Sequence, residues 1–460
     1  MTTLIAITRH ELRRALRDRA LPWLLVLFAA LAAYGAWNGA QWAKERAATV
    51  QLITDELGPL VEMRREQLAE APAGTWPFSS TPQLAPFRLV LRPGAMAALS
   101  IGQAEAYPYA ARMIPLQDIT MFDYFKVDVD NPAVRAAGRF DLAFVIVFVL
   151  PLVLLAAAFD LWSRERERGV AAMVLSQPVG PLSLLAGKAL ARALLVLPPV
   201  IAIVLASLIA FGASQPEGLA ATAVVVLVYG LFWIALAALI NVFARRSTDA
   251  ALAGGAAWLA IGVLAPALAL ATANVVSPAP SELQFSANYL EQSRAIRKEQ
   301  REARGPELPG DPAPKIPDRI RNFFKERTAE DQRLAPLVQS QLQARAERRA
   351  VLDALRLFLP SVAVQDALDR IAGADADRAV AFQSQAMSFT AQTKAWLAQR
   401  LANDQPLASE DYDHLPRFQF REAPAGAFQT GVLVDLAALA AAIAFLAAGA
   451  VLGRRSAASL

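Results

Sequence analysis

The chain has no cysteine and only two histidines, His10 and His414. Without thiols, the chain can hold no disulfide, no thiolate metal site and no cysteine nucleophile. Two histidines this far apart argue against a multi-histidine metal centre within one chain. Because His414 stands among Glu410, Asp411 and Asp413, we interpret it as a surface histidine.

Charge is also scarce, since charged residues make up 19% of the chain and hydrophobic residues 55%. The apolar residues are collected into uninterrupted runs, and roughly 20 such residues let a helix cross the hydrocarbon layer. The sequence therefore predicts a mainly α-helical, polytopic membrane protein with six transmembrane helices. The predicted spans are 21–42, 140–162, 189–212, 219–243, 250–273 and 430–452.

The first 20 residues place apolar side chains at helical spacing and basic ones elsewhere. This pattern is typical of an amphipathic helix that lies in the membrane interface. Its basic side chains are Arg9, Arg13, Arg14 and Arg17. A cleaved signal peptide is the alternative, because a basic region precedes an apolar one, but no convincing small-residue cleavage site closes the apolar run.

Two large polar blocks, 43–139 and 274–429, separate the spans, and the second is largely helical in pattern. The remaining connections include a cytoplasmic loop at 163–188 and a tail at 453–460. With six crossings, the basic clusters outside the large blocks all fall on one side, which the positive-inside rule assigns to the cytoplasm. Both termini are therefore expected in the cytoplasm and both large blocks outside it. Those clusters lie at 9–19, 164–192, 245–246 and 454–455.

Ion-driven carriers usually keep ionisable residues within their spans. Here Asp141, Asp160 and Asp435 fall at the ends of predicted spans, where we expect them to cap or anchor helices within reach of water. The pair Gly35 and Gly39 forms a G-x-x-x-G pattern that suits close packing of the first span, most simply within the chain.

No nucleotide or zinc motif is complete. The stretch from Gly180 to Lys188 has the wrong glycine spacing for a phosphate loop, and Ala189 stands where Ser or Thr would hold magnesium. The stretch HELRR, which begins at His10, lacks the second histidine of a zinc protease. Energy for any transport is therefore expected to come from another chain.

The segment after the second span alternates in charge from Arg164 to Arg168, which suits pairing with another charged surface. Gly169 permits a sharp turn, and Pro178 and Pro181 stop the short apolar helix that follows. We expect Lys188 to anchor the opening of the third span at the headgroups. A plain charged loop is the alternative interpretation.

This segment resembles the corresponding loop of permease subunits of type-2 ABC exporters. The shared order is E-R-E-x-G, a short apolar helix, L-S-x-P-V and a lysine at the next helix, carried here by Glu165, Arg166, Glu167, Arg168, Gly169, Leu175, Ser176, Pro178, Val179 and Lys188. The resemblance implies a coupling helix that contacts the ATPase through Arg164, Glu165, Arg166, Glu167, Arg168, Gly169, Leu175, Pro178 and Lys188. It also implies that the N-terminal amphipathic helix is the connecting helix.

The resemblance further implies a permease subunit of an ATP-driven transporter, an exporter, in the bacterial inner membrane. Its partners would be two ABC ATPase subunits, a second permease (identical or related), lipid and periplasmic proteins, with no nucleic acid. This chain would bind no cofactor or metal, and ATP and Mg would belong to the ATPase. The stretch 122–145 (FDYFKVDVDNPAVRAAGRFDLAFV) resembles a branch with enlarged outer domains.

Two other functions compete with transport. The membrane part could serve only as an anchor or assembly platform for periplasmic partners. The chain could also be an intramembrane or periplasmic enzyme, but neither polar block contains a nucleophile elbow, a metal motif or a paired-carboxylate signature.

Overall fold

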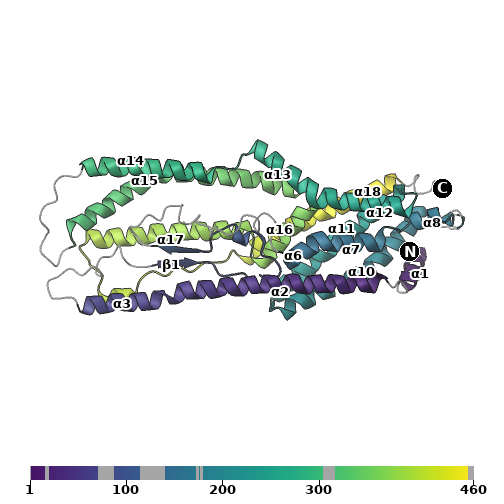
Figure 1. The fold of residues 1–460 in the computed structure, drawn as a ribbon, viewed down its shortest axis with the longest axis horizontal. Coiled ribbons are helices and arrows are strands. Elements are labelled where there is room, and N and C mark those ends of the chain that lie inside the picture. Colours follow the sequence, from purple (N-terminus) through teal and green to yellow (C-terminus); the bar gives the residue numbers. More distant parts are fainter. Residues whose placement is uncertain are drawn as a thin grey trace.

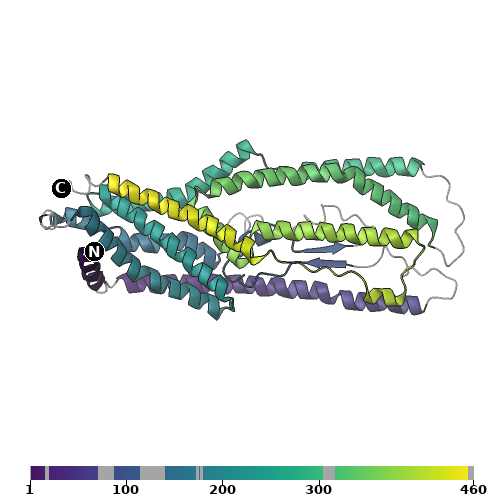
Figure 2. The ribbon, with the colours of Figure 1, turned by 180° about the vertical axis from the view of Figure 1, so that it is seen from behind.

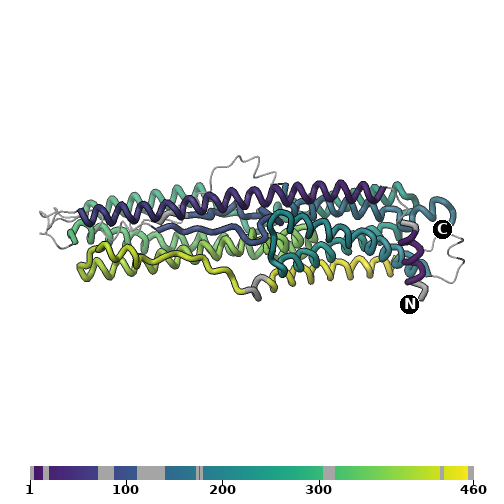
Figure 3. The backbone as a smooth tube through the Cα atoms, turned by 90° about the horizontal axis from the view of Figure 1, so that it is seen from below, coloured from purple at the N-terminus to yellow at the C-terminus, as the bar shows by residue number. Residues whose placement is uncertain are grey.

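The computed structural model describes residues 2–15, 20–70, 87–113, 140–171, 173, 176, 180–303 and 316–453. The molecule is elongated and mostly helical, with both chain termini at one end (Figure 1). We call that end the terminal end of the membrane bundle. The opposite end of the bundle carries a long distal domain, and a single helix, α2 (Ala20–Asp55), runs from one part into the other (Figure 3).

Six helical segments are long and apolar enough to cross a membrane, which confirms the predicted architecture. They are Ala20–Ala69, Leu142–Glu167, Pro181–Ala210, Pro216–Phe243, Ser247–Val276 and Gln429–Leu452. The 36 residues of α2 extend over roughly 54 Å at 1.5 Å per residue, more than the thickness of the hydrocarbon layer, about 30 Å. The first span therefore continues directly into the distal domain.

Two of the spans contain a π-helical turn that lies just before a proline. The second span is built from α6 (Leu142–Phe144), the turn η4 (Val145–Val149) and α7 (Leu150–Ala158), and the fifth from α12 (Ser247–Leu259), the turn η5 (Ala260–Leu264) and α13 (Ala265–Val276). Pro151 and Pro266 follow these turns, and because proline has no N–H, the regular helical ladder cannot continue unchanged there.

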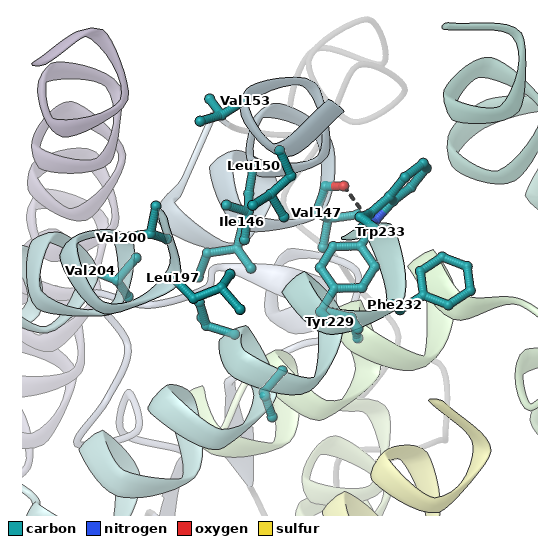
Figure 4. Close-up of a cluster of buried hydrophobic side chains, with 14 of the residues drawn as sticks. Ile146, Val147, Leu150, Val153, Leu197, Val200, Val204, Tyr229, Phe232 and Trp233 are labelled. Carbon is teal, nitrogen blue, oxygen red and sulfur yellow. Dashed lines mark hydrogen bonds between the residues drawn. The ribbon is translucent and has the colours of Figure 1, made fainter. Parts of the chain in front are cut away.

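The helix α11 (Pro216–Phe243) forms the centre of the bundle, between α7, α10 (Pro181–Ala210) and α18 (Ala425–Leu452). Its Tyr229, Phe232 and Trp233 are buried beside apolar side chains of η4, α7 and α10 (Figure 4). The Tyr229 hydroxyl donates to the carbonyl oxygen of Val147 at 2.9 Å, inside the π-helical turn. An aromatic donor thus satisfies a backbone acceptor that has no water available to it.

The distal domain is formed by both polar blocks together (Figure 2). Its elements are α3 (Leu57–Ala69), β1 (Phe87–Val90), η3 (Gly102–Glu105), β2 (Ala110–Met113), α14 (Glu282–Ala303), α15 (Asp318–Arg356), α17 (Ala376–Ala402) and η6 (Ser409–Asp413). The two strands pair antiparallel, with Phe87 opposite Met113. In the α14–α15 hairpin, the buried carboxylate of Glu330 accepts from Ser293 and pairs with Arg297 and Arg327.

Two stretches of the polar blocks belong to the bundle instead. The helix α16 (Pro360–Ala372) places Val364 and Leu368 in the bundle core, and residues 96–101 of segment 94–101 are buried at the distal end of the bundle. Sequence analysis assigned both stretches to outer domains. Their shortness and mixed composition hid this position, because neither stretch forms a long apolar run.

The glycines of the first span explain how segment 94–101 fits so closely. A Cβ on Gly39 would lie 2.7 Å from the carbonyl oxygen of Ala98, and one on Gly35 would lie 2.8 Å from the backbone of Asp141. The G-x-x-x-G pair therefore does permit close packing, and its partners are backbone segments of the same chain.

The expectation that three aspartates reach water was wrong. Asp435 is 0% exposed and Asp141 is 5% exposed, and the side chain of Asp160 is also buried. Asp141 does cap α6, since its carboxylate accepts from the backbone N–H of Phe144 at 2.8 Å. Asp160 pairs with Arg164 at 2.7 Å, and Asp435 pairs with Arg356 at 3.2 Å. The partner of Asp435 comes from a distant element, α15, whereas these partners of Asp141 and Asp160 lie within four residues of them. Position at a span end therefore did not predict exposure.

Candidate functional site

The charged segment after α7 lies at the terminal end of the bundle, where its short helix α8 (Ser163–Glu167) is held by α11 (Figure 1). The buried amide of Asn241 on α11 makes this connection. Its oxygen accepts from the backbone N–H groups of Trp162 and Ser163 at 3.0 and 3.1 Å, and its nitrogen donates to the carbonyl of Phe159 at 3.0 Å. One side chain thus satisfies backbone hydrogen-bonding groups at the end of α7 and at the start of α8.

Sequence analysis missed Asn241. The signal was present, because it is a lone amide in the last turn of an otherwise apolar span. In lipid or at its border, such a group needs internal hydrogen-bond partners.

The alternating charges of α8 are used mainly within the chain. The Arg166 guanidinium donates to the carbonyls of Val242 and Ala244 at 3.2 and 2.9 Å, at the C-terminus of α11. The Glu167 carboxylate accepts from the backbone N–H of Ser247 at 3.1 Å, at the first residue of α12. These two side chains therefore tie α8 to the turn between the fourth and fifth spans. Both contacts match the charge preference of the helix end concerned.

Glu165 and Lys188 form an ion pair with each other. Lys188 lies inside α10, which begins at Pro181, and its ammonium also lies 5.4 Å from the centre of the buried Trp162 ring. The expectation that Lys188 anchors a helix at the headgroups was therefore wrong. The third span begins earlier than predicted because Pro181 is well suited to the first turn of a helix, where its missing N–H costs nothing.

A second ion pair stands beside the first. Arg164 contacts Asp160 at 2.7 Å, and Arg192 of α10 lies 3.9 Å from the same carboxylate. The segment is thus connected to α10 by two sets of charges and to α11 and α12 by hydrogen bonds. Such a set of contacts fixes α8 relative to three spans.

The helix α8 ends at Glu167, and Gly169, two residues later, has a φ of +67°. The N–H of Gly169 donates to the carbonyl of Arg166 and the N–H of Val170 to that of Glu165, the paired bonds of a Schellman motif. Around this turn two side chains face away from the protein, since Arg168 is exposed and Met173 is 66% exposed, whereas Ala171 is buried in the bundle core. Leu175 and Pro178 lie outside the described residues.

The helix α1 (Thr2–Ala15) packs against α10 beside this segment. The Thr8 hydroxyl donates to the carbonyl of Gly187 at 3.2 Å, next to Lys188. Arg9 and Arg13 are exposed, as expected for an interfacial helix. Arg17 and the side chain of Arg14 lie outside the described residues.

Gly180 and Pro181 are the cap and first residue of α10, so the stretch that partly resembles a phosphate loop is the beginning of a helix. Within the part of the chain that the structure describes, no group of three or more acidic, histidine or cysteine side chains could hold a metal ion.

The family comparison covers almost the whole chain. The profile described as "ABC-2 family transporter protein" matches residues 5–452. Among curated proteins, a search gives no significant match. Membership of this family implies a multi-pass membrane permease subunit and an ABC ATPase as its partner, while the enlarged-domain branch stays a prediction. Together with the six apolar helices, the match shows that the chain belongs to the ABC-2 transporter family.

Proposed function

We propose that this permease subunit couples ATP hydrolysis by separate ATPase subunits to export across the bacterial inner membrane. The terminal end of the bundle would face the cytoplasm, and the distal domain would lie on the periplasmic side. Two ATPase subunits, which hold the ATP and Mg, and a second permease copy or related chain would complete the transporter.

This proposal rests on a difference within the charged segment, where some side chains contact the protein itself and others face outward. Three side chains contact their own chain and hold the turn after α8 in place: Glu165, Arg166 and Lys188. From that turn, Arg168 and Met173 point outward. A partner bound to the outward residues would move α8 as a unit. Because α8 is bonded to α10, α11 and α12, that movement would reach three spans.

The same contacts suggest how α1 takes part. Its bond to Gly187 places it beside Lys188, so a partner on the outward turn could also reach the exposed Arg9 and Arg13. Coupling requires that the permease conformations differ in their contacts with the ATPase. We infer that these contacts involve the outward turn and α1, with Gly169 shaping the turn.

The test places acidic side chains on the outward turn. The variants Met173→Glu and Arg168→Glu should leave the fold intact, because neither side chain is buried. We expect loss of copurifying ATPase and of substrate-linked ATP hydrolysis. Ser409→Glu, exposed on η6 in the distal domain, is the matched control and should retain both. If the two outward variants also retain both, the coupling role fails and a membrane anchor becomes the better interpretation.

A further inference from the structure

The distal end of the bundle is closed by two elements that sequence analysis placed outside it. Segment 94–102 follows β1 and enters the bundle between α2, α11 and α16, and its Met96 and Leu99 are fully buried. A Cβ on Gly218 of α11 would lie 2.8 Å from the Met96 side chain. We call segment 94–102 the plug segment.

A polar cluster holds the plug segment against α16. The Ser100 hydroxyl lies 2.6 Å from a carboxylate oxygen of Asp369 on α16 and 3.4 Å from one of Asp141 at the start of α6. Ser100 is 0% exposed and Asp369 is 2% exposed. At Gly102, which has a φ of +48°, a Cβ would lie 2.6 Å from the Asp369 carboxyl group. Three elements distant in sequence therefore converge on two carboxyl groups and one hydroxyl.

The hydrogen-bond donors are divided unequally between the two carboxyl groups. Asp141 accepts from the backbone N–H groups of Phe144 and Ile101 at 2.8 and 2.9 Å, so each of its two carboxyl oxygens has a backbone donor. Asp369 accepts only from neutral side-chain donors, Ser100 and the Gln365 amide at 2.8 Å, and both bonds reach the same oxygen. A single hydroxyl proton cannot serve both carboxylates.

Two guanidinium groups pair with the neighbouring acid of α16, Asp366. Arg356 and Arg370 each donate to Asp366 at 2.6 Å, one turn away from Asp369. Other ionisable groups on elements packed against α16 include Asp353 of α15, which contacts Arg356, Glu105 of η3, Asp435 of α18, and Glu217 and Tyr229 of α11. Burial raises the pKa of Asp369 to about 8, and the negative charges of Asp141 and Asp366 act in the same direction.

We propose that Ser100, Asp141 and Asp369 form a proton-binding site, and that the proton it holds keeps the plug segment closed on α16. The protonated carboxyl of Asp369 is neutral, so it can remain buried beside Asp141. Loss of that proton would leave two buried carboxylates joined by one hydroxyl, which favours release of the plug segment into water. This property is independent of which protein docks at the terminal end.

The sign of the pH dependence follows from linkage. In the closed state Asp369 titrates near pH 8, and in a released, solvated state it would titrate near its ordinary value of 3.8. Between these values the closed state binds more protons than the released state, so closure weakens as pH rises. Release should increase by up to about tenfold per pH unit over this window and level off above about pH 8.

The chain's lack of cysteine makes this measurable with one introduced thiol. Ala97→Cys is suitable because the side chain is buried in the plug segment but lines a cavity of about 420 Å³, which leaves room for sulfur. The full-length protein in membranes is treated with a membrane-impermeant thiol reagent between about pH 5 and pH 9. The rate of thiol modification at each pH is divided by the rate for Ser409→Cys, an exposed thiol. This ratio removes the intrinsic pH dependence of the reagent.

We expect the ratio to rise from about pH 5 to pH 8 and then level off. Asp369→Asn, which stays uncharged, should give a flat, low ratio, whereas Glu105→Gln on the neighbouring η3 should keep the rise. Ser100→Ala should raise the ratio at low pH, because it removes the bridging hydroxyl. Any one of four results would overturn the proposal. These are a flat ratio in the parent, the same rise in Asp369→Asn, an unchanged ratio in Ser100→Ala, and a ratio that depends on sodium in place of pH.

Discussion

The two ends of the membrane bundle handle buried charge in opposite ways. At the terminal end, Glu165 pairs with Lys188 and Asp160 with Arg164, so each acid has a base. At the distal end, Asp141 and Asp369 share one hydroxyl. A paired charge suits a rigid connection. A shared acid pair changes state with pH and suits a closure that opens.

Breaking the buried pair at the terminal end should have the largest effect. Lys188→Met leaves the Glu165 carboxylate without its cation, and removal of one partner from a buried pair costs about 3–5 kcal/mol. Because Glu165 is partly exposed, we expect the lower end of that range. Thermal unfolding of the purified protein in detergent measures the change. The double variant Glu165→Leu, Lys188→Met should recover most of the loss, and equal loss in both would show that the pair is not the cause.

Blocking the close approach at the distal end should have an intermediate effect. In Gly39→Ala the new Cβ would meet the Ala98 carbonyl at 2.7 Å, so the plug segment must shift, at a cost of about 1–3 kcal/mol. Gly255→Ala is the matched control, because it also lies in a membrane helix and its Cβ would meet no atom within 4 Å. The control should be neutral or up to about 1 kcal/mol more stable, since alanine favours helix. Equal melting temperatures for the two variants would argue against close packing at Gly39.

Removing an exposed ion pair in the distal domain should have the smallest effect. Arg333 of α15 and Glu299 of α14 lie 2.9 Å apart, with side chains 50% and 66% exposed. Water and salt screen such pairs, so Arg333→Ala should change the free energy of unfolding by less than about 1 kcal/mol. A loss as large as that of Lys188→Met would contradict the distinction between buried and exposed charges.

The membrane architecture was readable from the sequence because a span is a local property. A run of apolar residues long enough to cross the hydrocarbon layer is visible without knowledge of any neighbour, and all six predicted spans have counterparts in the structure. The sequence motif around Glu165 likewise pointed to the ABC-2 family, which the match over residues 5–452 confirms.

The partners of individual polar side chains were not readable. Lys188 was expected at the headgroups, yet it pairs with Glu165 inside the protein. Asp435 was expected near water, yet it pairs with Arg356. Asn241 was not predicted to have a role, although it connects α8 to α11. Each of these partners is distant in sequence, and no local pattern states which one a side chain will meet.

The sequence by itself thus determined how many helices cross the membrane and to which family the chain belongs, because apolar length and a contiguous motif are local properties. Only the tertiary structure decided which charges face outward at the terminal end and which acids share a hydroxyl at the distal end. Burial and pairing depend on elements far apart in the chain, such as Ser100, Asp141 and Asp369, which become neighbours only when the bundle is packed.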